Sequence, residues 1–500
     1  MTDLWRSFVG ALGGLDLIVF GCAIAALFVI AWLTGRKSAS TRAYFLGERR
    51  IPWPVACLAF VATEISAVTI LSVPADGFGK NWFYLQFFIG SAAAKVFVAF
   101  VFVPLFFRRE YTTIYEYLGV RFGRETQCAG AAFFFITRLL GSGVRLCMAS
   151  GGVAWIMGWH FVPTLIGFTI VSVAFIGIGG IKAVMWAGAF STTVFYLAGG
   201  TVIAYLLNHI TGGVGQAWQV AHEAGKLRVI NLQFSLSDSK TLWVAAASTF
   251  FTNVAVFGAD QDFVQRLLTV KTRRASQLAV FGSIGAALPL VVTYLTVGTL
   301  LFVFYKLGGV AAPVKSDHIL PDFTRQFLPD GLKGLVLAAV VLASIDSPLN
   351  SLSASFVTDI YRPLIRKAAS ERHYLWVSRG CVVAFGVILC AIAWAFSLAT
   401  ENLLWIAIQI LVVLGGPILG VFLLGLLTKV KVNRGNVAAM VIATVHVGII
   451  YLLSVRGLYP IAWTWLIVVG TAETFGFGYL LSFMGRGRPL FGAEDADAGR

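Results

Sequence analysis

The feature that most constrains this chain is the recurrence of apolar stretches long enough to cross a lipid bilayer. A crossing α-helix needs about 17 to 25 mostly apolar residues, and such stretches follow one another between residues 13 and 485. Charged residues make up only 12% of the chain, about half the share found in soluble domains. Ten-residue segments of alternating polarity, the pattern of a transmembrane barrel, do not occur in the sequence. We therefore predict an all-α polytopic membrane protein.

About thirteen apolar spans can be drawn along the chain from their length alone. They lie approximately at residues 13–35, 53–79, 81–107, 127–158, 161–180, 184–208, 241–266, 275–306, 333–357, 374–397, 402–428, 435–454 and 461–485. Lys and Arg concentrate in every second connection, from 36–50 to 429–434. Because cytoplasmic loops carry the excess of Lys and Arg, we expect the N-terminus outside and the C-terminus inside.

Composition and motifs exclude several classes of protein. The net charge of +15 could suit a nucleic-acid partner, but the basic residues lie at helix ends, so no such partner is expected. The six cysteines form no CxxC pair, and the chain has no GxSxG motif and no paired His/Asp metal set. We therefore expect neither an enzyme nor a zinc protein. The residues after Met1 lack a basic region and a cleavage site, so no cleaved signal peptide is expected.

Two of the spans contain polar residues where a continuous helix would be apolar. The second span reads VATEISAVTILSVPADGFG (61–79), and the seventh reads TNVAVFGADQDFVQRLL (252–268). They lie five spans apart, so they cross the membrane in opposite directions. Broken helices related in this way are typical of inverted five-helix repeats that build a site at the membrane midplane. The alternative is that they are two unrelated polar helix ends.

Five segments resemble, in order, core helices of the sodium/solute symporter family. They are the stretch at 61–79, GGIKAVMWAG (179–188), GADQDFVQRLL (258–268), GLKGLVLAAVVLASIDSPLNSLSASFVTDIY (331–361) and GPILGVFLLGLL (416–427). The resemblance implies a LeuT-type fold of two inverted five-helix repeats. It implies five regions: an extra helix and basic loop at 1–50, the repeats at 51–210 and 240–430, two further helices at 431–485, and a cytoplasmic tail at 486–500.

The resemblance also implies a sodium site between the first and eighth core helices. Its candidate residues are Ala62, Ile65, Val340, Ala343, Ser344, Asp346 and Ser347. Unwound backbone and helix hydroxyls supply the oxygens that replace the water of the ion. Ala343 stands where the family usually has a hydroxyl, and Gly188 stands where some members carry an acid. Asp346 is open to three interpretations: a sodium ligand, a proton-titrating group, or a structural hydrogen-bonding residue beside Pro348.

A substrate site at the membrane midplane follows from the same resemblance. Its candidate residues are Glu64, Ser66, Thr69, Gln86, Arg138, Arg145, Asn253, Val256, Phe257 and Gln409. Arg138 and Arg145 are seven residues apart and share one helix face, and a guanidinium group suits a carboxylate. We prefer Arg138, which lies nearer the membrane centre. The alternative is that Arg138 pairs with an internal acid such as Glu64 and that Arg145 extends outward.

The sequence thus predicts a monomeric transporter of the cell membrane that uses alternating access. Its coupling ion is expected to be Na⁺, with no organic cofactor, and its solute a small organic anion or amino acid. Val256-Phe257 replaces the aromatic pair of the sugar carriers, which argues against a sugar. The alternatives are a proton-coupled symporter of the same fold, a sugar or vitamin carrier, and a membrane solute sensor. Lys95 is expected to pair inside the bundle or to extend to its surface.

Overall fold

The structure is a computed structural model of the 500-residue chain. It describes residues 12–35, 40–108, 111–309, 311, 313, 318–345, 348–398, 401–458 and 462–484, with backbone only at 401–411, 455 and 484. Within these residues every regular element is helical. The predicted all-α class is confirmed.

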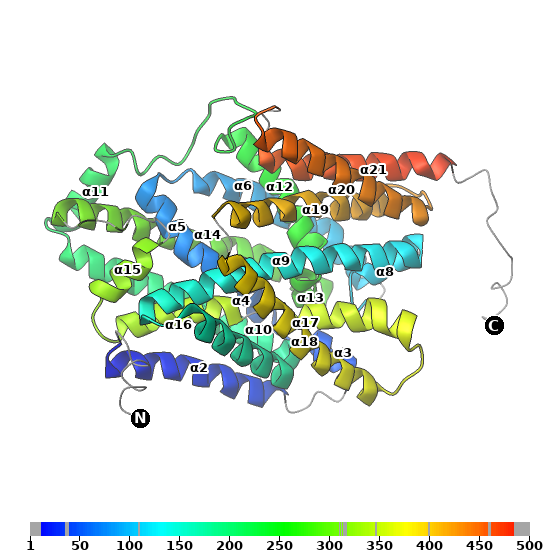
Figure 1. Cartoon of the computed structure of the whole chain (residues 1–500), viewed down its shortest axis with the longest axis horizontal. Helices are drawn as coiled ribbons and strands as arrows, with labels where there is room; N and C mark the ends of the chain where they lie inside the picture. The colour runs from blue at the N-terminus through cyan, green and yellow to red at the C-terminus, as the bar shows by residue number, and fades with distance from the viewer. Residues whose placement is uncertain are drawn as a thin grey trace.

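Most of the long helices run roughly along the long axis of the molecule, and α18 crosses them obliquely (Figure 1). The first half contains α2 (Gly14–Gly35), α3 (Thr41–Leu46), α4 (Trp53–Glu64), α5 (Ala67–Gly79), α6 (Tyr84–Phe97), α7 (Val103–Phe107), α8 (Tyr115–Phe122), α9 (Arg124–Met157), α10 (Phe161–His209) and α11 (Gly213–Glu223). The second half contains α12 (Leu242–Gly258), α13 (Gln261–Leu267), α14 (Arg273–Gly308), α15 (Ile319–Gln326), α16 (Leu332–Ile345), α17 (Leu349–Ser355), the π-helical η4 (Phe356–Ile365), α18 (Glu371–Leu398), α19 (Glu401–Leu427), α20 (Arg434–Val455) and α21 (Leu466–Met484).

Helix length and apolar character agree with the predicted membrane crossings. In the described part of the chain, nine helices are long and apolar enough to cross a bilayer, or up to eleven if each bent pair counts as one span. The 49-residue α10 would be roughly 73 Å long if it were straight, more than twice the thickness of the hydrocarbon core. It is broken at Gly180, whose φ of 55° is not helical. The break falls at the predicted boundary between spans 161–180 and 184–208.

Both predicted helix interruptions are confirmed. The chain bends by 63° between α4 and α5 and by 64° between α12 and α13. Ile65, at the end of α4, has an extended conformation (φ −88°, ψ 100°). Asp260 begins α13 as its N-cap and accepts a hydrogen bond from the Asp262 N–H at 2.8 Å. Because a short carboxylate at this position satisfies an otherwise unpaired N–H, the helix restarts there.

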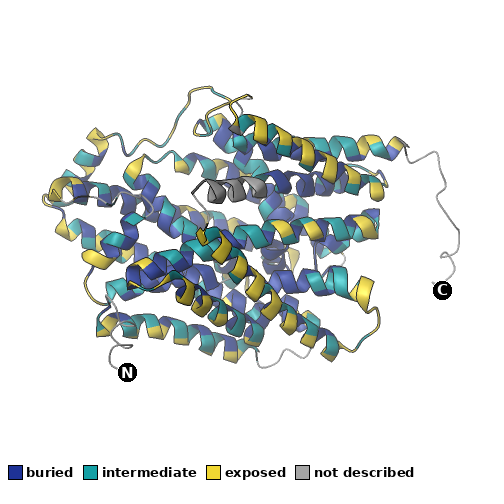
Figure 2. Cartoon of the chain, viewed as in Figure 1, coloured by how far each residue is buried: buried dark blue, intermediate teal, exposed yellow. Residues whose placement is uncertain are grey.

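An aromatic cluster joins the two broken helices. The ring centroids of Phe60, Phe257 and Phe263 lie 5.2 Å from one another in all three pairs. The three rings are buried, and tilted or edge-on aromatic pairs at this distance are favourable beyond their buried area. In Figure 2 this central part of the bundle is mostly dark blue, while α18, α20 and α21 carry many exposed residues. The interior is therefore where the two breaks meet.

Buried polar contacts close one end of the bundle near α8, on the right of Figure 1. The Gln261 side chain accepts from the Ile114 N–H at 2.9 Å and donates to the Thr112 carbonyl at 3.1 Å. Thr113 donates to Asp359 at 2.7 Å, and Gln127 donates to the same carboxylate at 2.9 Å. The loop before α8 is therefore fastened both to α13 and to η4.

Candidate functional site

A cavity of about 360 Å³ lies between the two helix breaks. Its size falls within the range of small-molecule sites. The residues that line it come from α4, α5, α8, α9, α12, α19 and α21: Glu64, Ser66, Val68, Thr69, Tyr115, Phe134, Thr137, Arg138, Gly141, Val144, Arg145, Thr252, Ala255, Val256, Ala259, Asp260, Val412, Gly415, Ile418 and Ile467. The wall of the cavity is therefore mostly apolar and contains a few charged and hydroxyl groups. Such a wall is typical of a site that fixes the orientation of a small polar solute.

Glu64 lines this cavity, and its carboxylate is paired with the Lys95 ammonium group. Lys95 donates to its carboxylate at 2.6 Å, and the Lys95 side chain is fully buried. The ammonium group also lies 5.2 Å from the centre of the Phe257 ring, within the range of a cation–π contact. The prediction that Lys95 pairs inside the bundle is confirmed.

Arg138 forms ion pairs with two carboxylates of the second broken helix. Its guanidinium group lies 3.5 Å from Asp260 and contacts Asp262 directly. Asp262 also lies 3.6 Å from Arg266, which is 1% exposed. The expected alternative that Arg138 pairs with an internal acid is therefore confirmed, but the acids are Asp260 and Asp262 rather than Glu64. The pairing joins α9 to α13.

Arg145 lies two turns further along α9 and contacts the first break. Its Nη1 atom donates to the Thr63 carbonyl, in the last turn of α4, at 3.2 Å. Arg145 lines the large cavity together with Glu64 and Ser66. The alternative that Arg145 extends outward is wrong, because its guanidinium group contacts the carbonyl end of α4.

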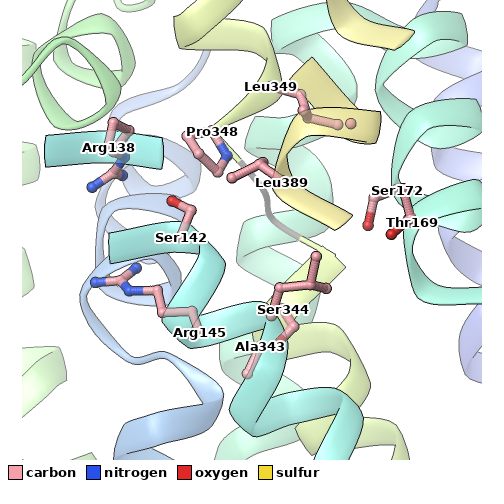
Figure 3. A pocket seen from close by; sticks show the side chains of 12 residues that line it. Arg138, Ser142, Arg145, Thr169, Ser172, Ala343, Ser344, Pro348, Leu349 and Leu389 are labelled. Atoms are coloured by element: carbon pink, nitrogen blue, oxygen red, sulfur yellow. The ribbon is translucent and has the colours of Figure 1, made fainter. Parts of the chain in front are cut away.

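A second cavity of about 30 Å³ lies on the other side of α9, with room for one or two water molecules. Its lining includes Ser142, Ser172, Ala343 and Ser344, and again the two arginines (Figure 3). The guanidinium groups point away from Ser172 in this view. The hydroxyls of Ser172 and Ser344 are buried and have no hydrogen-bond partner among the described residues. Such groups need water or an ion.

Two of the other predicted sodium residues lie at the first break. Ala62 and Ile65 are buried at the end of α4, and Val340 is buried in α16. A helix end leaves its last four carbonyls without helical partners, and the Ala62 carbonyl is one of these in α4. Asp346 and Ser347 lie outside the described residues.

Gly188, in the second half of α10, packs closely against α4. A side chain at this position would place its Cβ 2.9 Å from the Ala59 Cα atom on α4. Because that neighbour is backbone, it cannot move aside without shifting the helix. The close packing of α10 on α4 therefore leaves no room for an acidic side chain at this position.

Four predicted substrate residues are not shown in the cavity lining. Gln86 accepts from the Asn231 N–H at 2.8 Å and donates to the Lys240 carbonyl at 3.0 Å, so its amide fixes the loop before α12. Phe257 belongs to the buried aromatic cluster, and the described lining does not include Asn253. The Gln409 side chain lies outside the described residues.

Tyr115 and Asp260 line the cavity but were not among the predicted site residues. Asp260 falls within the quoted GADQDF segment, where its place directly after Gly258-Ala259 at a helix break was a signal. Tyr115 belongs to a short helix between spans, and no apolar pattern points to it. Its hydroxyl donates to the Ala259 carbonyl at 3.2 Å, which brings α8 against the second break.

Comparison with known proteins identifies the family. The sequence pattern described as the sodium:solute symporter family matches residues 44–443, most of the chain. The chain belongs to the sodium:solute symporter family. It is 27% identical over 456 residues to the sodium-coupled monocarboxylate transporter 2 of Danio rerio, covering 87% of this chain and 71% of that protein. It is also 27% identical over 440 residues to the sodium/sialic acid symporter SiaT of Proteus mirabilis, covering 86% and 87%.

Solved structures show the same fold. A Na⁺-coupled sialic acid symporter in a substrate-bound outward-open state superposes with a TM-score of 0.85 at 22% identity, covering 94% of this chain and 98% of that one. Mhp1, a nucleobase-cation-symport-1 family transporter, superposes with a TM-score of 0.53 at 14% identity, covering 92% and 97%. The family symporter is therefore an integral membrane protein of LeuT-type fold. It couples solute transport to Na⁺ and is not an enzyme.

Proposed function

We propose that this symporter carries a small organic anion with a carboxylate group, and that Arg145 binds this carboxylate. The observation that carries the proposal is the position of Arg145 in the wall of the large cavity, beside the first helix break. A planar guanidinium group recognises a carboxylate through two parallel hydrogen bonds. An ionisable residue within a membrane-spanning helix marks a functional site by default.

The two arginines of α9 differ in their contacts. Arg138 contacts two carboxylates and Arg145 a backbone carbonyl. We therefore favour Arg145 over Arg138, the reverse of the preference drawn from the sequence.

The named solutes of the relatives agree with this assignment. A monocarboxylate and a sialic acid both carry a carboxylate, and the relatives named for them align with more than four fifths of this chain. The remaining polar groups of the cavity that we assign to the solute are Ser66, Thr69, Thr137 and Thr252. For Na⁺ we propose the carbonyls at Ala62, Ile65 and Val340 and the Ser344 hydroxyl. Contributions from Asp346 and Ser347 stay predictions.

Uptake into proteoliposomes tests the proposal. Radiolabelled pyruvate, N-acetylneuraminate, proline and glucose are offered under an inward Na⁺ gradient, under an inward proton gradient without Na⁺, and under neither. We expect at least one of the two carboxylate anions to accumulate with the Na⁺ gradient and not with the proton gradient. Accumulation of glucose alone would contradict the proposal.

Variants of Arg145 test the assignment of the carboxylate. We expect Arg145→Gln to raise the KM for the anion by about a hundredfold, since the loss of a buried charge partner costs about 2–5 kcal/mol. Arg145→Lys keeps the charge and should lose less. Arg456→Gln, which removes an exposed arginine just after α20, is the matched control. Unchanged KM in Arg145→Gln would exclude Arg145 as the carboxylate receptor.

A further inference from the structure

The connection between α11 and α12 carries four exposed apolar side chains, which we call the apolar row: Ile230, Leu232, Phe234 and Leu236. Their exposed fractions are 57%, 65%, 78% and 55%. The connection lies outside the helices and crosses the top of Figure 1 from α11 to the start of α12. Much of it is coloured as exposed in Figure 2. Because contiguous exposed apolar side chains are unusual on a protein surface, the apolar row marks a contact surface.

Hydrogen bonds hold this connection against the bundle. The Asn231 N–H donates to the Gln86 side chain at 2.8 Å, and the Asn231 carbonyl accepts from the Leu242 N–H at 2.8 Å. The Arg228 carbonyl accepts from the Trp82 N–H at 3.1 Å. Asn231 is half-buried, whereas its apolar neighbours on both sides are exposed. The apolar row is therefore presented in a fixed position by a backbone that is bonded to the protein.

Two indole rings tie the apolar row to the ends of membrane-crossing helices. The Trp243 Nε1 atom donates to the Leu232 carbonyl at 3.4 Å, and the Trp465 Nε1 atom donates to the Leu236 carbonyl at 3.1 Å. Trp243 is the second residue of α12, and Trp465 lies directly before α21. Both α12, with α13, and Trp463–Phe483 are candidate membrane spans. Tryptophan is enriched where a span meets the membrane surface, so the apolar row lies at that depth.

The chemistry of the connection suits the boundary between lipid headgroups and acyl chains. Irregular backbone does not enter the hydrocarbon where it faces lipid, but apolar side chains of a segment at the boundary reach about 5–10 Å into it. Arg228 and Lys240 lie exposed at the two ends of the connection. Their long side chains can keep an apolar stem against lipid and a charged end among the phosphates. Trp243, which is 52% exposed, continues the apolar surface onto α12.

We propose that the apolar row is a lipid anchor, which inserts its four side chains into the leaflet on the side that the distribution of Lys and Arg predicts to be outside. Through the bond between Asn231 and Leu242, the anchor fixes the start of α12, the helix that ends at the second break. The proposal depends neither on the identity of the solute nor on the sodium site.

Two other surfaces could cover the apolar row: the mouth of the large cavity and a second copy of the chain. The described lining of the large cavity includes none of the four side chains, which argues against the first. Lipid is favoured over a second copy because the row is continuous with the exposed Trp243 at the end of a spanning helix and has a basic residue at each end. The experiments below distinguish all three.

Electron paramagnetic resonance of a nitroxide label measures what covers the apolar row. The label is attached to Phe234→Cys in the full-length protein in phospholipid nanodiscs, with the six native cysteines replaced by alanine. Oxygen concentrates in lipid and a nickel chelate in water, so we expect the ratio of their relaxation effects to be about fivefold higher than in the exposed loop control Asp238→Cys. It should approach the ratio of Val445→Cys, which is exposed on α20. A ratio equal to that of Asp238→Cys, or exclusion of both reagents, would overturn the proposal.

A photoreactive benzoylphenylalanine in place of Phe234 keeps the native cysteines and serves if the cysteine-free protein does not fold. After irradiation in liposomes, we expect mass spectrometry to find the chain joined to a phospholipid, and to find this product much less often with the same group in place of Asp238. A joined pair of chains would assign the apolar row to a second copy, and a link within one chain would assign it to the cavity mouth. Either product in place of the phospholipid, or no phospholipid product at all, would overturn the proposal.

Discussion

At the scale of single residues, buried charges in this bundle are compensated across helix boundaries. Lys95 on α6 pairs with Glu64 on α4, and Arg138 on α9 pairs with Asp262 on α13. Such pairs bring little net stability, because each ion gives up its water, but the loss of one partner leaves a buried charge. These two ion pairs hold α6 against α4 and α9 against α13 beside the cavity.

The Lys95–Glu64 pair gives a direct test of this compensation. We expect Lys95→Met to destabilise the protein by about 3 kcal/mol, because it removes the cation that contacts the Glu64 carboxylate. The double variant Lys95→Met/Glu64→Gln should recover most of the loss. The melting temperature in detergent measures both changes, and Lys80→Met, which breaks the exposed pair with Asp76, is the control with almost no expected effect. Equal losses in the single and double variants would contradict the compensation.

At the scale of elements, α2 supplies the N-terminal cap of another helix. The fully buried Asp16 carboxylate accepts from the Gly331 and Gly334 N–H groups, both at 2.7 Å, and from the Gly13 N–H at 3.0 Å. α16 begins at Leu332, so the Gly334 N–H belongs to its unpaired first turn and the Gly331 N–H lies directly before it. The extra N-terminal helix therefore anchors the helix that carries Ser344.

Replacing Asp16 should loosen that anchor. We expect Asp16→Ala to lower the free energy of unfolding by about 2–3 kcal/mol, since it leaves buried N–H groups without acceptors. Gly334→Ala should also destabilise, because its Cβ would lie 2.4 Å from the Asp16 carbonyl oxygen. Asp238→Ala, in the exposed loop before α12, is the control. The melting temperatures of the purified variants measure these losses of stability. An Asp16→Ala protein as stable as the control would show that the cap is dispensable.

At the scale of the whole molecule, the two helix breaks face one cavity, and Tyr115 of α8 lies in its wall. Glu116, the next residue, lies outside the spans. Burial, reinforced by the Asp359 carboxylate, raises the pKa of Glu116 to about 7, although the Thr112 and Thr113 N–H groups and Arg362 act in the opposite direction. Between about pH 4.5 and 7 the folded protein thus holds a proton that the unfolded chain has released. Glu116 therefore lowers stability as pH rises through this window.

Glu116→Gln tests this dependence. In the wild type, the Thr112 N–H lies 3.4 Å from the Glu116 carboxylate. The amide oxygen of Gln keeps an acceptor for this N–H. We expect it to raise stability by about 1–2 kcal/mol at pH 8, after discounting for solvent, and to have little effect at pH 4.5. Melting temperatures of wild type and variant across this pH range measure the difference. If the difference in melting temperature between variant and wild type is the same at pH 4.5 and pH 8, Glu116 does not titrate as stated.

Prediction from the sequence succeeded where a local pattern is enough. The spans follow from apolar length, and the two breaks follow from Glu64 and Ser66 in one span and from Gly258 and Asp260 in the other. Prediction failed where a side chain depends on a distant neighbour. Gln86 looked like a cavity residue, but its amide meets a loop that lies more than 140 residues away in the chain.

The sequence by itself determined that the chain crosses a membrane as helices, that two helices break, and that it belongs among sodium-coupled symporters. Apolar length and helix-breaking residues act locally, so their consequences can be seen along the chain. Only the tertiary structure decided which charges meet: Arg138 with the acids of α13, and Arg145 with the end of α4. Both arginines share one face of α9, and the bend of the surrounding helices assigns them different partners.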